Sequence, residues 1–173
     1  MKKKGLIMLG LITILLLASI TPGCGLFGGV KKPSVGYVPQ DWYRYEDISY
    51  GEIVDNAGLE WGLITYVDEV DWDAVNIFYG DVPSILQGNE NDSAALIAYA
   101  VECSLVFVPQ ETGTMVVAGH LAGYTRTHDA TNAWYEMEII FVEGSTCIDI
   151  YTIFDDNAAD EAQVMSLINS IDF

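Results

Sequence analysis

The chain has 173 residues, a mass of 19.0 kDa and a formal net charge of −18 at pH 7. This length suits a single domain with appendages and is sufficient to bury a hydrophobic core. Residues 41–173 hold 25 acidic side chains, two arginines and no lysine. Such a surface repels phosphate backbones, so we expect no nucleic-acid partner. It attracts cations or a basic protein, or it simply keeps an exposed protein soluble.

The first 23 residues are organised as a secretory signal peptide. Three lysines at positions 2–4 precede a run of 16 uncharged residues, 5–20. A membrane-spanning helix needs about 20 apolar residues, and Thr21, Pro22 and Gly23 end this run too early. The pattern therefore predicts export of the chain rather than a transmembrane anchor.

The signal ends at Gly23 and Cys24, and this pair resembles the lipobox of bacterial-type lipoproteins, in which a small residue precedes the cysteine that becomes the new N-terminus. The resemblance implies a diacylglyceryl thioether on Cys24. It also implies attachment to the outer face of the cytoplasmic membrane or to another membrane of the cell envelope. Two acyl chains are sufficient for stable anchoring. The alternative is an ordinary cleaved signal followed by an incidental cysteine.

Residues 24–40 are predicted to form a flexible tether between the lipidated cysteine and the domain. After Cys24 they contain four glycines and two prolines and show neither helical nor strand periodicity. Lys31 and Lys32 lie within reach of lipid headgroups, where they add to membrane retention, or they are simply solvated. We therefore place one globular domain at residues 41–173.

The domain is predicted to contain strands and helices in the order of an α+β fold. Residues 42–50 are dense in aromatic side chains and are expected at an edge of the core or over a sheet end. Asn91 or Asp92 is placed to cap the first helix, and Asp156 or Asn157 the last. The predicted elements are strands 61–67 and 74–79, a helix over 93–104, strands 114–118 and 121–128, a hairpin over 134–154, and a helix over 157–171. This order predicts an antiparallel sheet of about six strands packed with helices.

The hairpin over 134–154 has the clearest periodicity, with a polar turn at 143–146. A period of two places one row of side chains against the core and the other toward solvent or a second layer. The row expected in the core consists of Tyr135, Met137, Ile139, Phe141, Ile148, Ile150, Thr152 and Phe154. The other row consists of Glu136, Glu138, Ile140, Cys147, Asp149 and Tyr151.

The order of elements, a glycine-containing strand at 117–123 and the ending of the last helix at 168–173 resemble the PsbP and Mog1 superfamily, including the DcrB-like bacterial lipoproteins. The likeness covers roughly residues 42–173. It implies an antiparallel sheet between helices, an αβα sandwich that is used for binding and assembly. It implies no shared catalytic residues that can be assigned to this chain.

Asp68, Glu69, Asp71 and Asp73 form the densest acidic cluster, between two predicted strands. Carboxylates are hard oxygen ligands suited to Ca²⁺ or Mn²⁺. The spacing does not match an EF-hand loop, and the alternative is a solvated connection. We therefore assign no metal ligand and expect no cofactor, apart from weak binding of Ca²⁺ or Mn²⁺ at this acidic patch.

The sequence contains no nucleophile elbow, P-loop, dinucleotide fingerprint or zinc-protease motif. His120 and His128 offer either a weak metal site or a pair of surface histidines. Cys103 and Cys147 remain after lipidation of Cys24, and they form either a disulfide, as in many exported proteins, or two buried thiols. We therefore predict no catalytic residue.

Together these features predict a membrane-anchored extracytoplasmic lipoprotein of non-catalytic binding or assembly type, held by Cys24 and engaging an envelope protein. The first alternative is a lipoprotein that binds a divalent cation or a small ligand. The second is an envelope hydrolase, because 25 acidic side chains leave room for an acid–base pair.

Overall fold

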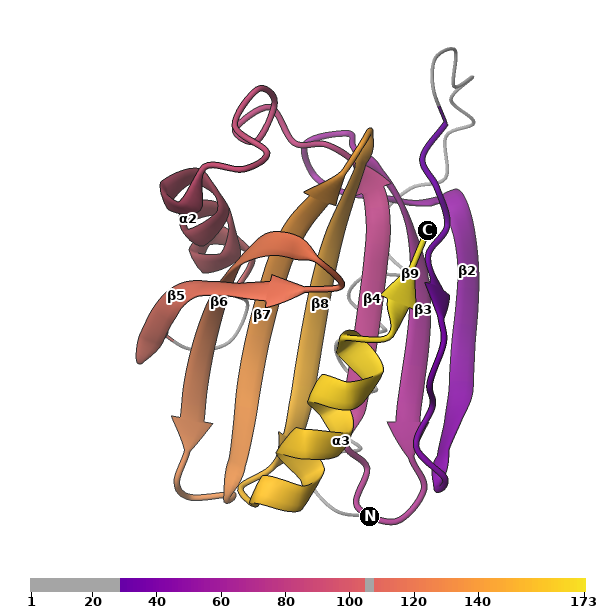
Figure 1. The fold of residues 1–173 in the computed structure, drawn as a ribbon, viewed down its shortest axis with the longest axis vertical. Helices are drawn as coiled ribbons and strands as arrows, with labels where there is room; N and C mark the ends of the chain where they lie inside the picture. The colour runs from indigo at the N-terminus through magenta and orange to yellow at the C-terminus, as the bar shows by residue number, and fades with distance from the viewer. Residues whose placement is uncertain (1–28, 105–107) are drawn as a thin grey trace.

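Residues 29–104 and 108–173 are described in a computed structural model, where they form a seven-stranded antiparallel sheet, a two-stranded sheet and two helices (Figure 1). The order across the large sheet is β2-β3-β4-β8-β7-β6-β5. Its strands are β2 (Trp42–Val54), β3 (Glu60–Asp68), β4 (Ala74–Asp81), β5 (Glu111–Val117), β6 (His120–Asp129), β7 (Trp134–Glu143) and β8 (Thr146–Asp155). Two meanders, β2 to β4 and β5 to β8, are therefore joined side by side through the β4–β8 pair.

In the described part of the chain, one helix packs on each face of the large sheet. Helix α2 (Ser93–Cys103) contacts β5, β6 and β7, and helix α3 (Ala158–Ile168) contacts β8 and β4 on the opposite face (Figure 1). Gly123 of β6 lies directly under α2, because a Cβ atom at this position would stand 2.4 Å from the backbone carbon of Leu96. The predicted α+β class is confirmed, with a helix on both faces of a mostly antiparallel sheet.

Both helices begin at predicted caps. The Asp92 carboxylate accepts a hydrogen bond from the Ala95 amide at 2.9 Å. The Asn157 side chain accepts hydrogen bonds from the Ala159 and Asp160 amides, both at 3.0 Å. These bonds satisfy amides that have no partner within the helix. Helix α3 ends at Ile168, three residues before the predicted end, and its Val164, Leu167 and Ile168 are fully buried.

The main core lies between α3 and the sheet. Its residues come from the middle of the sheet and from the inner face of α3, and several are completely removed from solvent. The fully buried members include Val75, Ile77, Phe141, Ile148, Ile150, Phe154, Val164 and Leu167. A second cluster lies under α2 and contains Ile53, Trp61, Leu63, Leu86, Leu96, Ala100, Ile140, Val142 and Cys147. Both faces of the central strands are therefore covered.

The β7–β8 hairpin is confirmed as predicted. The two strands pair from Trp134 opposite Asp155 to Glu143 opposite Thr146. The connection is the two-residue turn of Gly144 and Ser145, and Gly144 has a φ of +58°, a conformation that costs glycine little.

The sheet has one strand more than the six expected from the sequence. The additional strand is β2, an edge strand that pairs with β3. Its pairing is interrupted twice, between Arg44 and Glu46 and between Ile48 and Ile53. These irregularities break the period of two that identifies a strand from its sequence.

The prediction of a flexible tether is wrong for residues 30–40. Strand β1 (Ser34–Val35) pairs with β9 (Ile171–Asp172) after α3. The Gly36 amide donates to the Ser170 carbonyl at 2.9 Å. Val30, Val35 and Val38 pack against the main core. Glycine and proline content alone was misleading, because three valines at spaced positions supply enough apolar surface to hold this segment on the domain.

Candidate functional site

A cluster of carboxyl groups lies on the face of the sheet that carries α2. Strand alternation places Glu136 and Glu138 on this face of β7, opposite the row of Met137 and Ile139 that enters the main core. On β8, Tyr151 lies directly opposite Glu138, and Asp149 lies two pairs further along, opposite Ile140 and on the same face. We call Glu136, Glu138, Asp149 and Tyr151 the carboxyl cluster.

The carboxyl cluster is buried and incompletely hydrogen-bonded. Glu136, Glu138 and Tyr151 are 7%, 4% and 5% exposed. Glu136 Oε1, Glu138 Oε2, Asp149 Oδ1 and the Tyr151 hydroxyl have no hydrogen-bond partner of standard geometry among the described residues. Tyr151 is nevertheless close enough to Glu136 to influence its pKa. Most buried polar atoms in native proteins have a hydrogen-bond partner, so four such atoms in one cluster distinguish this part of the sheet.

Burial and mutual repulsion make the cluster retain protons. Removal from water raises the pKa of Glu136, and it raises the pKa of Glu138 further because the Asp149 charge adds to the effect. Burial also raises the pKa of Asp149. Glu138 and Asp149 lie within hydrogen-bonding reach of each other, so one of them carries the proton between them. No basic side chain contributes to any of these pKa shifts.

The cluster continues toward α2 and toward an aromatic group. The Cys103 thiol, at the end of α2, donates toward Asp149. On the other side, Trp134, Tyr151 and Ile153 form a small buried group with Phe78 packed against it. The buried acids therefore lie between the end of α2 and an aromatic group.

These residues were not singled out by the sequence. Alternation assigned Glu136, Glu138 and Asp149 to the outer row of the hairpin, where solvent or a second layer was expected. The signal that could have identified them is the apolar character of the same row, since Trp134, Ile140 and Tyr151 alternate in step with the acids.

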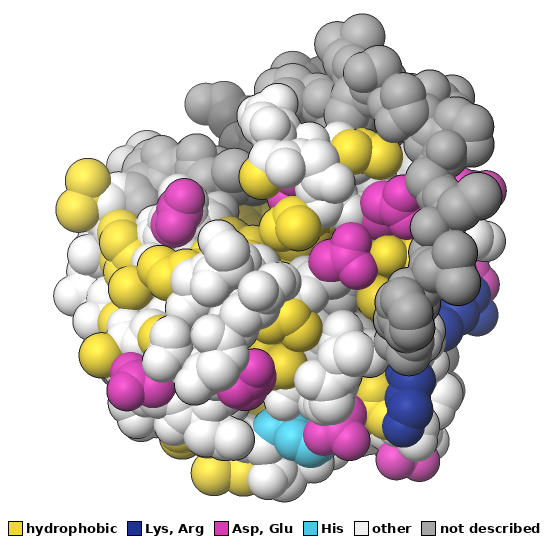
Figure 2. Space-filling model, turned by 90° about the horizontal axis from the view of Figure 1, so that it is seen from above, with side chains coloured by type: hydrophobic (Ala, Val, Ile, Leu, Met, Phe, Trp, Pro, Cys, Tyr) yellow, Lys and Arg dark blue, Asp and Glu magenta, His cyan; other side chains and the backbone are white. Residues whose placement is uncertain are grey.

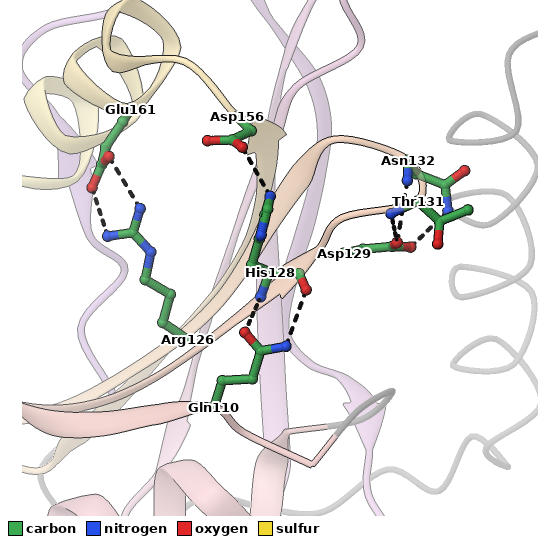
Figure 3. Close-up of polar contacts among 8 residues, drawn as sticks. All are labelled: Gln110, Arg126, His128, Asp129, Thr131, Asn132, Asp156 and Glu161. Atoms are coloured by element: carbon green, nitrogen blue, oxygen red, sulfur yellow. Dashed lines mark hydrogen bonds and ion pairs between the residues drawn. The ribbon is translucent and has the colours of Figure 1, made fainter.

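A separate open hollow of about 530 Å³ lies at the end of β6. It is lined by Val108, Gln110, Thr127, His128, Asp129, Ala130, Thr131 and Asn132. Figure 3 shows that the side chains of Gln110 and Asp129 bond to backbone groups of neighbouring residues. Gln110 exchanges two hydrogen bonds with the His128 backbone, and Asp129 accepts from the Thr131 and Asn132 amides. These contacts fix the loops around the hollow.

His128 is held on the face that carries α3. Its Nε2 lies 2.9 Å from Asp156 Oδ2, and its ring stacks on Tyr135 with 4.7 Å between ring centres (Figure 3). Next to it, Arg126 forms two hydrogen bonds with Glu161 of α3, at 2.9 and 3.1 Å.

His120 lies at the other end of β6, 3.4 Å from Glu143. The two histidines are about 26 Å apart along the strand and hold no metal ion together.

The structure divides the predicted acidic patch. Asp68 accepts a hydrogen bond from the Val70 amide, and Asp73 is 1% exposed and accepts from the Asp155 amide. Only Asp71 joins another acidic group, where it can offer an oxygen within 4.8 Å of oxygens of Asp155 and Asp160. Glu69 is exposed and outside this group. The candidate cation ligands are therefore Asp71, Asp155 and Asp160, half-buried residues from three separate segments.

The two cysteines of the domain are free thiols. Cys147 is buried and Cys103 is half-buried. The predicted lipidation residue, Cys24, lies outside the described residues, as do residues 1–23 of the predicted signal peptide. Neither helix of the described residues has the length and apolar character needed to span a membrane.

The sequence matches no known protein-family model and no curated protein.

Proposed function

We propose that this chain is a lipid-anchored binding protein of the cell envelope, exported and held on the outer face of a membrane through Cys24. The observation that carries the proposal is the sequence of three lysines, a 16-residue uncharged run and the Gly23–Cys24 pair. The arrangement of one helix on each face of an antiparallel sheet supports the PsbP/Mog1-like αβα sandwich, a scaffold for binding and assembly.

A lipid at Cys24 would hold the domain close to the membrane. The packed chain begins by residue 30, and the Lys31 amide donates to Thr146 Oγ1 at 2.9 Å, beside the β7–β8 turn. The five steps from Cys24 to Gly29 span at most about 17 Å. The end of the sheet at the β7–β8 turn would then face the membrane. Figure 2 shows this end, where basic side chains gather along one edge.

The test is the mass and location of the full chain expressed in a bacterial host. We expect wild-type protein in the membrane fraction, lacking residues 1–23 and carrying a diacylglyceryl group. Cys24→Ala should retain residues 1–23 or lose the lipid, while its domain remains folded. An unmodified wild-type chain, or a diacylglyceryl group found on Cys24→Ala, would refute lipid anchoring.

The binding activity we propose is recognition of a basic envelope protein. It is supported by the excess of acidic side chains, since residues 41–173 hold 25 of them against two arginines. Affinity purification of the lipidated chain from membranes should recover a partner that is released by salt, because attraction between opposite charges weakens with ionic strength.

The second candidate function is divalent-cation binding, favoured by the convergence of Asp71, Asp155 and Asp160. We would measure the melting temperature in EDTA and with Ca²⁺, Mn²⁺ or Zn²⁺ at constant high NaCl. An ion at 100 times its dissociation constant stabilises by about 2.7 kcal/mol. The rise should disappear in Asp160→Asn and persist in Glu102→Gln, which removes an exposed carboxylate on α2. No rise with any ion would remove this candidate.

A further inference from the structure

Residues 69–73 connect β3 to β4, and this β3–β4 loop presents two large apolar side chains to solvent. Val70 is 65% exposed and Trp72 is 44% exposed. The other three tryptophans of the chain are 6% exposed or less: Trp42, Trp61 and Trp134. Trp72 is therefore the one tryptophan that the fold leaves accessible to a partner. Tryptophan is among the residue types most enriched at the energetic centres of protein interfaces.

Hydrogen bonds fix the backbone of the β3–β4 loop. Across its base, the Asp68 amide donates to the Asp73 carbonyl at 2.9 Å. The Glu69 amide donates to the Asp41 carbonyl at 3.2 Å. The Trp72 amide donates to the Asp68 carbonyl, also at 3.2 Å. Because the backbone is already ordered, little conformational freedom is lost when a partner binds to the loop.

The loop lies at the end of the sheet farthest from the proposed lipid anchor. At one end of β8, Thr146 accepts a hydrogen bond from the Lys31 amide. Asp155, nine residue steps away, ends β8 about 30 Å from there at 3.3 Å per step, next to Asp71 of the loop. Figure 1 shows the β3–β4 connection at the lower end of the molecule and the β7–β8 turn at the upper end. On an anchored domain the loop would therefore point away from the membrane.

The surroundings of Trp72 are acidic. Glu69 and Asp71 belong to the loop, and Asp71 can offer an oxygen within 4.8 Å of oxygens of Asp155 and Asp160. The charge of this surface disfavours a second copy of the same acidic chain, and it also disfavours an anionic membrane. Exposed apolar area combined with negative charge is complementary to a segment that is cationic and can contact an aromatic ring.

We propose that the β3–β4 loop is the docking site for an arginine-bearing segment of a basic envelope protein, with a guanidinium group stacked on Trp72. This inference rests on the proposed function, for which it supplies the site. A planar guanidinium can stack on an indole ring and donate hydrogen bonds to carboxylates at the same time. A single arginine would therefore use both the ring of Trp72 and the acids beside it, whereas a lysine ammonium has no planar group to stack.

Binding of three synthetic peptides to the full chain, purified in a nonionic detergent, tests this site. The peptides alternate glycine with arginine, with lysine, or with citrulline, the uncharged isostere of arginine. Each carries a dye whose anisotropy reports binding at low salt. We expect the arginine peptide to bind most tightly and the citrulline peptide least. Trp72→Gly should weaken binding of the arginine peptide about tenfold or more.

Two controls separate loss of the ring from loss of the fold. Trp72 has a φ of +65°, a conformation that costs glycine little, so the melting temperature of Trp72→Gly should stay near that of the wild type. Tyr37→Ala removes another exposed aromatic side chain, 51% exposed and outside the loop, and should leave the affinity unchanged. In the wild type, the arginine peptide should also protect Trp72 from quenching by acrylamide, which must collide with an indole to quench it.

Equal affinity of Trp72→Gly and the wild type for the arginine peptide would overturn this docking site while leaving recognition of a basic partner intact. Equal affinity of the wild type for the arginine and lysine peptides would overturn stacking of the guanidinium group on the ring. Failure of both cationic peptides to bind either chain would instead refute recognition of a basic partner. Failure of this inference and failure of the proposed function are therefore distinguishable.

Discussion

The proton held between Glu138 and Asp149 ties the stability of the fold to pH. Both pKa values are raised in the folded chain, by burial and, for Glu138, by the Asp149 charge. The folded state therefore binds more protons than the unfolded state above about pH 4, the ordinary carboxyl range. Stability is fully present below the unfolded pKa values and is lost as pH rises through the folded ones.

We predict that Glu138→Gln flattens this pH dependence. The introduced amide can donate a hydrogen bond to Asp149 at any pH, because it does not titrate. The substitution should therefore raise the free energy of unfolding by about 1 to 2 kcal/mol at neutral pH. Urea denaturation at about pH 5 and about pH 8 measures the change. Glu102→Gln, at an exposed position on α2, is the control and should leave the dependence unchanged. A parallel pH dependence in Glu138→Gln and the wild type would contradict the shared proton.

Gly123 of β6 leaves room for the backbone of α2, which passes directly over it. We predict that Gly123→Ala lowers the free energy of unfolding by about 2 kcal/mol, because its Cβ would collide with the helix backbone at 2.4 to 2.7 Å. Gly113→Ala in β5 is the matched control. Its Cβ would meet the Tyr124 ring at 3.0 Å, and that side chain can move. Urea denaturation measures the free energy of unfolding of both variants. An equal decrease in the two would show that α2 shifts to accommodate the added methyl group.

At the scale of elements, the β1–β9 pair links both ends of the described chain to one edge of the core. We predict that Val35→Asp lowers the free energy of unfolding by about 2 kcal/mol, because Val35 packs against the main core and its strand pairs with β9. Tyr37→Asp, at a position 51% exposed, should be nearly neutral. Thermal melting of the full chain compares the two. A neutral Val35→Asp would restore the interpretation of residues 30–40 as a tether.

Elements with an uninterrupted period were predictable from the sequence, and elements defined by long-range pairing were not. The β7–β8 hairpin and α3 follow from local alternation, a turn and a cap, which act within a few residues. Strand β2 was missed because two irregularities break its alternation. Strand β1 was missed because its partner, β9, lies more than 130 residues away in the sequence. No local propensity reports such a contact.

The candidate site was less predictable than the fold for a related reason. Asp68 and Asp73 are adjacent in sequence to Asp71 but serve the local turn and the Asp155 amide. The acids that converge with Asp71 come from the end of β8 and the start of α3. Glu138 and Asp149 belong to different strands, so their contact depends on the register of β7 and β8, which the alternation alone leaves undetermined.

For the whole molecule, the dominant property is an excess of negative charge. The full chain has a net charge of −18, and removal of residues 1–23 would also remove three lysines and no acid, which gives −21 (−18 − 3). Like charges on a compact domain repel one another, and unfolding separates them. The screening length falls from about 30 Å at 0.01 M salt to about 10 Å at 0.1 M. Salt should therefore stabilise this protein.

We predict that the urea midpoint of the Cys24→Ser chain rises between about 0.01 M and about 0.5 M NaCl, with most of the increase complete once the screening length falls below 10 Å. Because the effect is general, KCl and choline chloride at the same ionic strength should act equally. A rise specific to one cation would instead indicate a binding site, and Asp160→Asn would locate it at the group formed with Asp71 and Asp155. A flat midpoint in all three salts would mean that the carboxylates are far enough apart, or protonated often enough, for their repulsion to leave stability unaffected.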